Sequence, residues 1–275
     1  MPAEHTRSLL ASEFALVFRR RRTWAMLAAL AVIPVLLAVV VWFSADPPEP
    51  GEGPPFLANV TQNGMFVSVT ALVITTPLFL PLTVAVVAGD SIAGEAGHGT
   101  LRYLLVGPAG RLRLLLVKYA GAALFCVAAP AAILTAGWVI GTALFGVGPV
   151  TLVSGASVGA GAAAVRSLLV ALHVLISLLG LSAIGLFIST LTDVPIGAMA
   201  TTAVLAVVAQ VLGQLPQLDW LHPWLFTDHW FGMAGLLREP ISWTALTDNL
   251  LLQAAYTAVF GALAYGRFST KDVLS

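Results

Sequence analysis

Residues 24–43 have the sequence WAMLAALAVIPVLLAVVVWF, which contains no charged residue. A helix needs about 20 such residues to cross the roughly 30 Å of hydrocarbon in a bilayer. Four arginines, at positions 19–22, come directly before this stretch. It is too long for the core of a typical secretory signal, and no clear small-residue cleavage site follows it. We therefore predict a retained transmembrane helix at this position.

The composition extends this prediction to the whole chain. Of its 275 residues, 59% are hydrophobic and only 9% are charged. A soluble domain of this size has about a quarter of its residues charged, so most of the surface is expected to face lipid. The net charge is zero, which gives a nucleic-acid partner no electrostatic support. We predict an all-α integral membrane protein whose residues 1–275 form a single transmembrane domain.

Six segments are apolar enough to be spans, and they define the expected architecture. Pro77 and Pro81 lie in the second segment and predict a kink, which membrane helices tolerate when neighbours satisfy the freed carbonyls. The last segment is short, and the third is long enough to tilt or to project from the bilayer. The spans are expected at about residues 24–43, 63–88, 112–145, 167–191, 196–215 and 248–266.

The distribution of lysine and arginine predicts the orientation. Only Arg166 and Arg238 fall on the side opposite the amino end, so eleven of the thirteen basic residues share one side. The positive-inside rule then places both termini in the cytoplasm. We expect a multi-pass protein of the cell membrane, with residues 216–247 as an outer segment between the last two spans.

The residues before the first span have their own pattern. Leu10, Phe14, Val17 and Phe18 fall on one helical face, which is typical of an amphipathic helix lying on the inner membrane surface. We expect this surface helix over residues 1–22, in contact with membrane lipid through its arginines. As an alternative, the arginines act only as a topology anchor.

The segment between the second and third spans, residues 89–111, carries the main functional signal. It contains the run GEAGHGTLRYLLVGPAGR from Gly94 to Arg111. Thr100 is placed to cap a short helix over residues 101–106, which Gly107 and Pro108 would end. A short capped helix at the inner end of two spans suits contact with a soluble partner. Its charges could instead form an internal salt bridge or be solvated.

This run, Gly-Glu-x-x-x-Gly-Thr-Leu-Arg-x-Leu-Leu-x-x-Pro-x-x-Arg, resembles the coupling-helix region of type-2 permeases of the ATP-binding cassette (ABC) transporters. The resemblance extends to the surface helix, the six spans, the segment Gly185 to Asp193 and the tail Arg267 to Asp272. It implies that a partner ATPase contacts the residues that match the motif. By position these are Glu95, Gly99, Thr100 and Arg102, with Pro108 and Arg111 fixing the exit from the loop.

The resemblance also implies the partners. They are two copies of an ATP-binding subunit, which would hold ATP and magnesium, and a second permease that is identical or homologous. The chain itself has no Gly-x-x-x-x-Gly-Lys-Ser/Thr phosphate loop, so we expect a transport subunit that is not an enzyme and binds no cofactor of its own. The implied activity is export by alternating access.

Polar residues within spans are candidates for the transport path, because such groups tend to line interfaces or cavities. Asn63 and Thr70 share a face of the second span, and Thr202, Gln210 and Gln214 fall within about a third of the circumference of the fifth. In the resembled family these spans border the path. The alternative is hydrogen bonding between helices. These polar groups are uncharged, which favours an amphipathic or apolar cargo over a small ion.

Three further features have mainly structural interpretations. His173 in the fourth span is expected to be neutral and bonded to a carbonyl, because we find no carboxylate in the spans to continue a proton relay. Cys126 is expected to be a buried apolar side chain. Gly137 and Gly141 form a Gly-x-x-x-Gly pair and predict a close helix contact.

The outer segment is rich in aromatic residues and predicts short helices at the membrane–water boundary. An alternative function uses its tryptophans and histidines as a haem platform, which would make the chain a haem-handling protein. A membrane enzyme is a further hypothesis, although no His-Glu-x-x-His or Gly-x-Ser-x-Gly motif is present, and so is a non-transporting anchor of a signalling complex. The residues of the haem hypothesis are Trp220, Trp224, Trp230, Trp243, His222 and His229.

Overall fold

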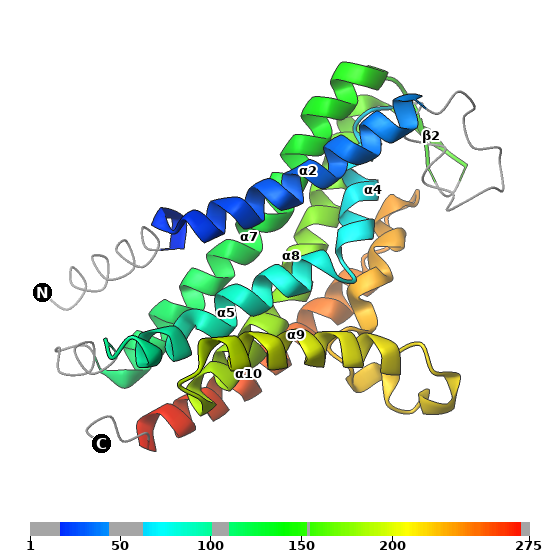
Figure 1. Cartoon of the computed structure of the whole chain (residues 1–275). Helices are drawn as coiled ribbons and strands as arrows, with labels where there is room; N and C mark the ends of the chain where they lie inside the picture. Colours follow the sequence, from blue (N-terminus) through cyan, green and yellow to red (C-terminus); the bar gives the residue numbers. More distant parts are fainter. Residues whose placement is uncertain (1–16, 44–62, 101–109, 153–154, 271–275) are drawn as a thin grey trace, which may run out of the picture.

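The computed structural model describes residues 17–43, 63–100, 110–152 and 155–270, and helices form nearly all of this part (Figure 1). The predicted all-α class is therefore confirmed. The one sheet described pairs two short antiparallel strands, β1 (Val150–Thr151) and β2 (Ser157–Val158). The helices are α2 (Arg21–Phe43), α4 (Phe66–Thr75), α5 (Phe79–Gly97), α7 (Arg111–Phe145), α8 (Ala160–Leu191), α9 (Pro195–Leu212), η1 (Pro216–Leu218), η2 (His222–Trp224), η3 (Asp228–Leu237) and α10 (Thr244–Thr270).

Helix α8 is the centre of the bundle. It packs against α10, α5, α7 and α9, and its side chains are buried along most of its length. Helices α2 and α9 are peripheral, with one buried stripe each and many exposed apolar side chains. Such an apolar exterior is expected where a helix faces lipid.

Five of the described helices are long and apolar enough to cross a membrane: α2, α5, α7, α8 and α9. Helix α10, where we predicted the sixth span, is long enough but less apolar. Its first turns include Asp248, Asn249 and Gln253. A sixth span in α10 and the orientation of the bundle remain predictions.

The predicted second span, residues 63–88, is two helices. The break lies at residues 76–78, next to Pro77, where the sequence predicted a kink. Gln210 of α9 donates a hydrogen bond to the Pro77 carbonyl at 2.5 Å. A neighbouring helix thus satisfies a carbonyl exposed by the break, as required away from water.

The predicted inner loop, residues 89–111, is shorter than expected. Helix α5 continues to Gly97, so residues 89–97 are helical, and several of them are buried. Glycines and an aspartate in this stretch are poor helix formers, but tertiary contacts described below hold them in the helix. The predicted short helix over 101–106 lies outside the described residues, as do Arg102 and Pro108.

Helices α4 and α7 approach closely at the predicted glycine pair. A Cβ added to Gly141 would lie 1.9 Å from the carbonyl oxygen of Gly64, and one added to Gly137 would lie 2.6 Å from the Cα of Ser68. Only glycine fits such contacts. The close-packing role predicted for Gly137 and Gly141 is confirmed.

Several helix boundaries differ from the predicted ones. Helix α8 starts seven residues earlier than expected, and α10 starts at Thr244, inside the predicted outer segment. Most of the predicted surface helix, including Leu10 and Phe14, lies outside the described residues. Arg21 and Arg22, assigned to that helix, belong to α2.

The outer segment forms short 3-10 helices, as predicted, but its tryptophans do not share one environment. Trp220 and Trp224 are exposed, whereas Trp230 is fully buried in the core. Its ring packs edge-on against Phe226. The boundary role predicted for this aromatic cluster is therefore wrong for Trp230.

Candidate functional site

A cluster of charged residues lies where the start of α2, the end of α5 and the start of α7 meet, at the end of the bundle where α10 ends (Figure 1). It borders a cavity of about 530 Å³. We name this set the basic-acidic cluster; it consists of Arg20, Arg22, Asp90, Glu95 and Lys118.

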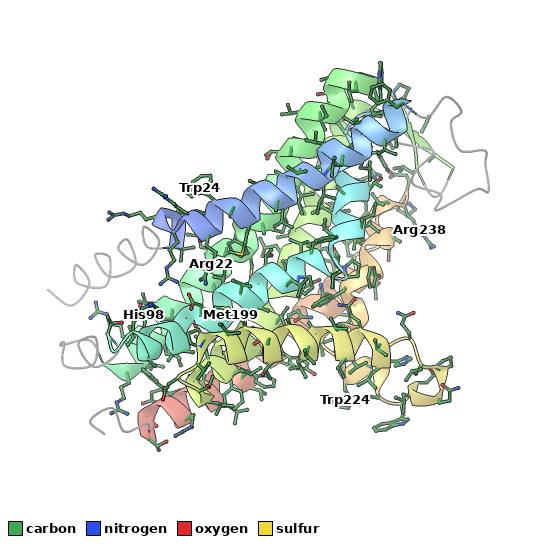
Figure 2. All side chains as sticks on the ribbon, viewed as in Figure 1. Arg22, Trp24, His98, Met199, Trp224 and Arg238 are labelled. Carbon is green, nitrogen blue, oxygen red and sulfur yellow. The ribbon has the colours of Figure 1, made fainter. Side chains whose placement is uncertain are left out.

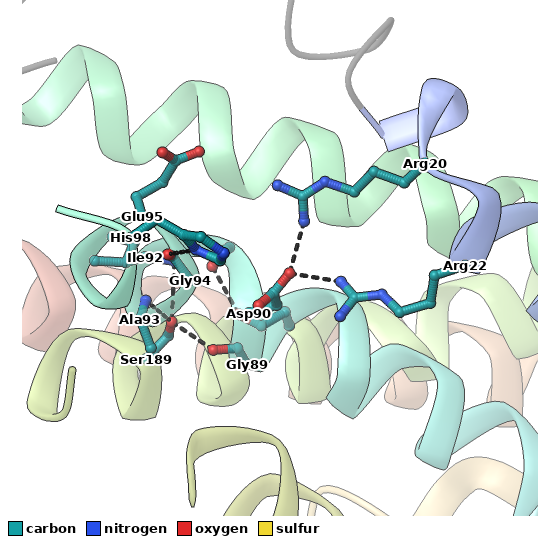
Figure 3. A network of polar contacts seen from close by, with 12 residues as sticks. Arg20, Arg22, Gly89, Asp90, Ile92, Ala93, Gly94, Glu95, His98 and Ser189 are labelled. Carbon is teal, nitrogen blue, oxygen red and sulfur yellow. Dashed lines mark hydrogen bonds and ion pairs between the residues drawn. The ribbon is translucent and has the colours of Figure 1, made fainter. Parts of the chain in front are cut away.

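Asp90 is the acidic centre of the basic-acidic cluster (Figure 3). It is 8% exposed, and its Oδ2 accepts hydrogen bonds from Arg20 at 2.6 Å and from Arg22 at 2.5 Å. A buried carboxylate requires such partners, because removing it from water is otherwise costly. The two ion pairs join the start of α2, and the residue just before it, to α5 across about 70 residues of sequence.

Ser189 of α8 is inserted into the backbone of α5 beside Asp90 (Figure 3). Its hydroxyl accepts hydrogen bonds from the amides of Ile92 and Ala93, at 3.0 and 2.8 Å, and donates one to the Gly89 carbonyl at 2.7 Å. A side chain inserted in this way is one of the recognised causes of helix bending. The end of α5 is therefore tied to α8 as well as to α2.

Glu95 is the second carboxylate of the cluster, one turn beyond Asp90. Lys118 of α7, which is 4% exposed, donates to its Oε1 at 3.2 Å. The Thr100 hydroxyl donates to its other oxygen, Oε2. Glu95 thus connects α5, α7 and the first residues after α5.

Glycines shape the end of α5. A Cβ on Gly94 would lie 2.6 Å from Oδ1 of Asp90, so this residue leaves room for the carboxylate. Gly99 has a positive φ of 69°, the conformation that commonly ends a helix and that favours glycine. The His98 ring donates from Nδ1 to the Gly94 carbonyl at 2.6 Å.

Arg111, the first residue of α7, contacts the end of α10. It donates to the carbonyls of Phe268 and Ser269, at 2.8 and 2.6 Å. Carbonyls in the last turn of a helix lack intrahelical partners, and a cation is favourable there. The start of α7 is therefore fastened to α10.

The structure thus brings together part of the predicted coupling set. Glu95, Gly99 and Thr100 lie at one place, and Arg111 lies at the α7–α10 contact. We did not predict Asp90, Ser189 or the pairing of Arg20 and Arg22. Asp90 had been assigned to a loop, but Asp90 and Glu95 both belong to helix α5, one of the helices long and apolar enough to be a span.

The five predicted path residues do not form one cluster. Asn63 is buried and donates to the Gly148 carbonyl at 2.5 Å, and Thr202 is buried and donates to Ala198 of its own helix. Thr70 is also buried, within α4. Gln210 reaches the α4–α5 break as described, whereas Gln214 is exposed just beyond the end of α9.

His173 is buried in α8 and lies in a polar group that the sequence did not indicate. Its Nε2 donates to the His229 carbonyl at 2.8 Å, as expected for a neutral ring bonded to a carbonyl. Asn249 donates to Ser177 at 2.9 Å, and Gln253 donates to the Phe226 carbonyl at 2.7 Å. Polar residues of α10 thus face α8 and fix the segment that contains η3.

The described residues contain no group of three or more histidine, cysteine or acidic side chains that could hold a metal ion. His222 and His229 each lie near a separate aspartate, Asp219 at 3.6 Å and Asp228 at 3.5 Å. Cys126 is buried, as predicted.

The fold defines the class of this protein: an all-α bundle with five helices suited to crossing a membrane, which indicate a membrane protein. The chain belongs to the family described as "Protein of unknown function (DUF2705)", whose profile matches residues 31–274. A comparison with curated proteins found no match.

Proposed function

We propose that this chain is the membrane-spanning permease subunit of an ABC transporter that exports an amphipathic or apolar compound. Two copies of a separate ATP-binding subunit would supply the energy and hold ATP with magnesium. A second permease, identical or homologous, would complete the path. The proposal places both termini in the cytoplasm and the charged end of the bundle against the ATPase.

The observation that carries the proposal is the way in which the end of α5 is fastened to its neighbours. Asp90 bonds to α2, Ser189 ties α5 to α8, and Glu95 bonds to Lys118 of α7. A force applied to residues 98–100 would therefore reach three helices together. A permease driven by a separate motor needs coupling between distant sites, and networks of hydrogen bonds and ion pairs that join rigid helices are one means of carrying it.

The motif supports the same conclusion. Glu95, Gly99 and Thr100 match it and lie together at the end of α5, with Glu95 between a lysine and the Thr100 hydroxyl. In the proposed mechanism, closure of the two ATP-binding subunits pushes this end, and the bundle changes from inward-open to outward-open. The candidate path residues are uncharged polar groups, which suits an amphipathic or apolar cargo.

The first experiment asks whether an ATPase binds at the charged end. Full-length protein with His98→Cys is treated in cells with a thiol cross-linker, and captured chains are identified by mass spectrometry. We expect a chain with a Gly-x-x-x-x-Gly-Lys-Ser/Thr loop. The matched control is Ser157→Cys, an exposed serine in β2, and the native Cys126 is fully buried and does not react.

A second measurement concerns coupling. Glu95→Gln is expected to lower the ATP hydrolysis of the purified complex severalfold. The helix content should stay unchanged, because the substitution weakens the ion pair with Lys118 and leaves the hydrophobic core as it is. Asp248→Asn, at an exposed position of α10, is the control and should have no effect. The proposal is wrong if no nucleotide-binding chain is captured, or if capture is equal from positions 98 and 157.

A further inference from the structure

The four arginines before the first span divide into two pairs. Arg20 and Arg22 are held by Asp90, as described above. Arg19 and Arg21 are exposed, and neither side chain makes a hydrogen bond or ion pair with the residues that the structure describes. Asp90 therefore fixes the start of α2 in a rotation that leaves Arg21 pointing outward.

Arg21 begins a stripe along the outer side of α2. The residues at 24, 28, 31 and 35 follow it at alternating spacings of three and four, which places them on one helical face. Trp24, the first of them, is 59% exposed. Trp24 and Arg22 project from different sides of the start of α2 (Figure 2).

The part of this stripe from Trp24 to Val35 forms one wall of an apolar groove of about 630 Å³ between α2 and α7. Arg21 lies on the same face, about one turn before this wall begins. Small side chains make the groove hollow. They are Ala28 and Ala31 on α2 and Ala132 and Ala136 on α7.

The two polar groups on the groove wall are already satisfied. The Thr135 hydroxyl donates to the Ala131 carbonyl of its own helix at 2.8 Å. The Trp24 indole donates to the Phe18 carbonyl at 2.6 Å. The groove therefore offers apolar contact along its length, and Arg21 follows on the same face about one turn beyond its Trp24 end.

We propose that this groove binds one acyl chain of an anionic phospholipid, with the headgroup phosphate on Arg21. The charge pattern matches such a ligand, since a phosphate is recognised by guanidinium groups and juxtamembrane arginines attract anionic headgroups. Trp24 lies between head and tail, where tryptophan is enriched at membrane interfaces.

The length of the groove agrees with this ligand. The α2 residues that line it run from Trp24 to Val35, which is about 16 Å at about 1.5 Å per residue. One leaflet accounts for about half of the roughly 30 Å hydrocarbon core. The groove thus extends over the depth of a single leaflet, starting from its charged surface.

The test is native mass spectrometry of the full-length protein in mild detergent, titrated with palmitoyl-oleoyl phosphatidylglycerol or phosphatidylcholine. We expect phosphatidylglycerol to bind about fivefold more tightly, the effect of about one arginine beside a headgroup of net negative charge. Phosphatidylcholine carries the same phosphate, but its choline cation offsets that charge. Arg21→Gln should remove that preference. Arg238→Gln, at an exposed arginine outside the arginine cluster (Figure 2), should leave it intact.

The chain contact is tested separately. Ala31→Leu fills the groove and should weaken binding of both lipids, whereas Ala29→Leu, on the exposed opposite face of α2, should not. Inorganic phosphate at millimolar concentration should not displace the lipid, because it lacks the tail.

Four results would overturn the proposal. The first is equal binding of the two lipids, and the second is an equal loss in Arg21→Gln and Arg238→Gln. The third is displacement by inorganic phosphate alone. The fourth is unchanged lipid binding in Ala31→Leu, which would show that the groove does not hold the acyl chain. If light scattering shows that the same substitution also dissociates a dimer, the groove is a contact with a second copy of the chain.

Discussion

Replacing Asp90 by asparagine tests the ion pairs that join α2 to α5. The change keeps the size of the side chain but removes the charge to which Arg20 and Arg22 donate at 2.6 and 2.5 Å. Charge-assisted hydrogen bonds contribute about 1.5 to 3 kcal/mol each when buried. Both arginine side chains are more than a third exposed, at 44% and 40%, so we discount each to roughly 1 kcal/mol.

Asp90→Asn is therefore expected to lower the free energy of unfolding by about 2 kcal/mol, a change of roughly thirtyfold in the unfolding equilibrium. The assay is equilibrium unfolding in mixed detergent micelles, followed by circular dichroism. A double-mutant cycle with Arg22→Gln should give a coupling energy of about 1 kcal/mol. Asp248→Asn, an exposed carboxylate in α10, is the control and should change stability by less than about 0.5 kcal/mol.

Two outcomes would refute this reasoning. If Asp90→Asn is no more destabilising than Asp248→Asn, the ion pairs contribute nothing to the fold. If the effects of Asp90→Asn and Arg22→Gln simply add, the two side chains do not interact in the folded protein, and the proposed link between α2 and α5 is lost.

Two further substitutions test the contacts that position the helices. Ser189→Ala removes the partner of two amides and one carbonyl, so we expect the free energy of unfolding to fall by about 1 to 3 kcal/mol in the same assay, with faster amide exchange near the end of α5. In Ser91→Ala, where the hydroxyl bonds to a carbonyl of its own helix, stability and exchange should not change. Equal effects of the two substitutions would contradict the role of Ser189 in joining α8 to α5. Gly141→Ala places a methyl group against the Gly64 backbone and should lower the free energy of unfolding by about 1 to 3 kcal/mol. Gly161→Ala, with open space around it, is the control and should be tolerated. A stable Gly141→Ala protein would show that α4 and α7 do not approach so closely.

The features predicted well from the sequence are those that depend on composition and local spacing. An uninterrupted apolar stretch of about 20 residues has few alternatives to a membrane helix, and α2 and α7 lie close to where they were expected. The contact of α7 at Gly137 and Gly141 also follows from local spacing, since both glycines lie on one face. The break near Pro77 follows from the chemistry of one residue.

The features that were missed depend on partners far away in the chain. Gly89, Asp90 and Gly94 favour a loop by their own propensities, and only contacts from α2, α8 and α9 keep them helical. Asp90 could not be matched with Arg20 and Arg22 without knowing that α2 and α5 are neighbours.

Trp230 illustrates the same limit in the outer segment. Tryptophan has a general preference for the membrane boundary, and this residue is nevertheless packed in the core beside Phe226. A buried position of this kind depends on how the whole segment folds back on α8 and α10. The spacing of hydrophobic residues in the sequence does not predict that arrangement.

The pairing of Asp90 with two arginines also has a consequence for biosynthesis. A nascent chain is made from its amino end at about 5 to 20 residues per second, so Arg19 to Arg22 leave the ribosome several seconds before Asp90 exists. All four cations are then available to favour the orientation that we predict for the first helix. In the finished protein the single carboxylate of Asp90 offsets one unit of this charge, so the positive charge at the start of α2 is greater before α5 is made than in the folded protein.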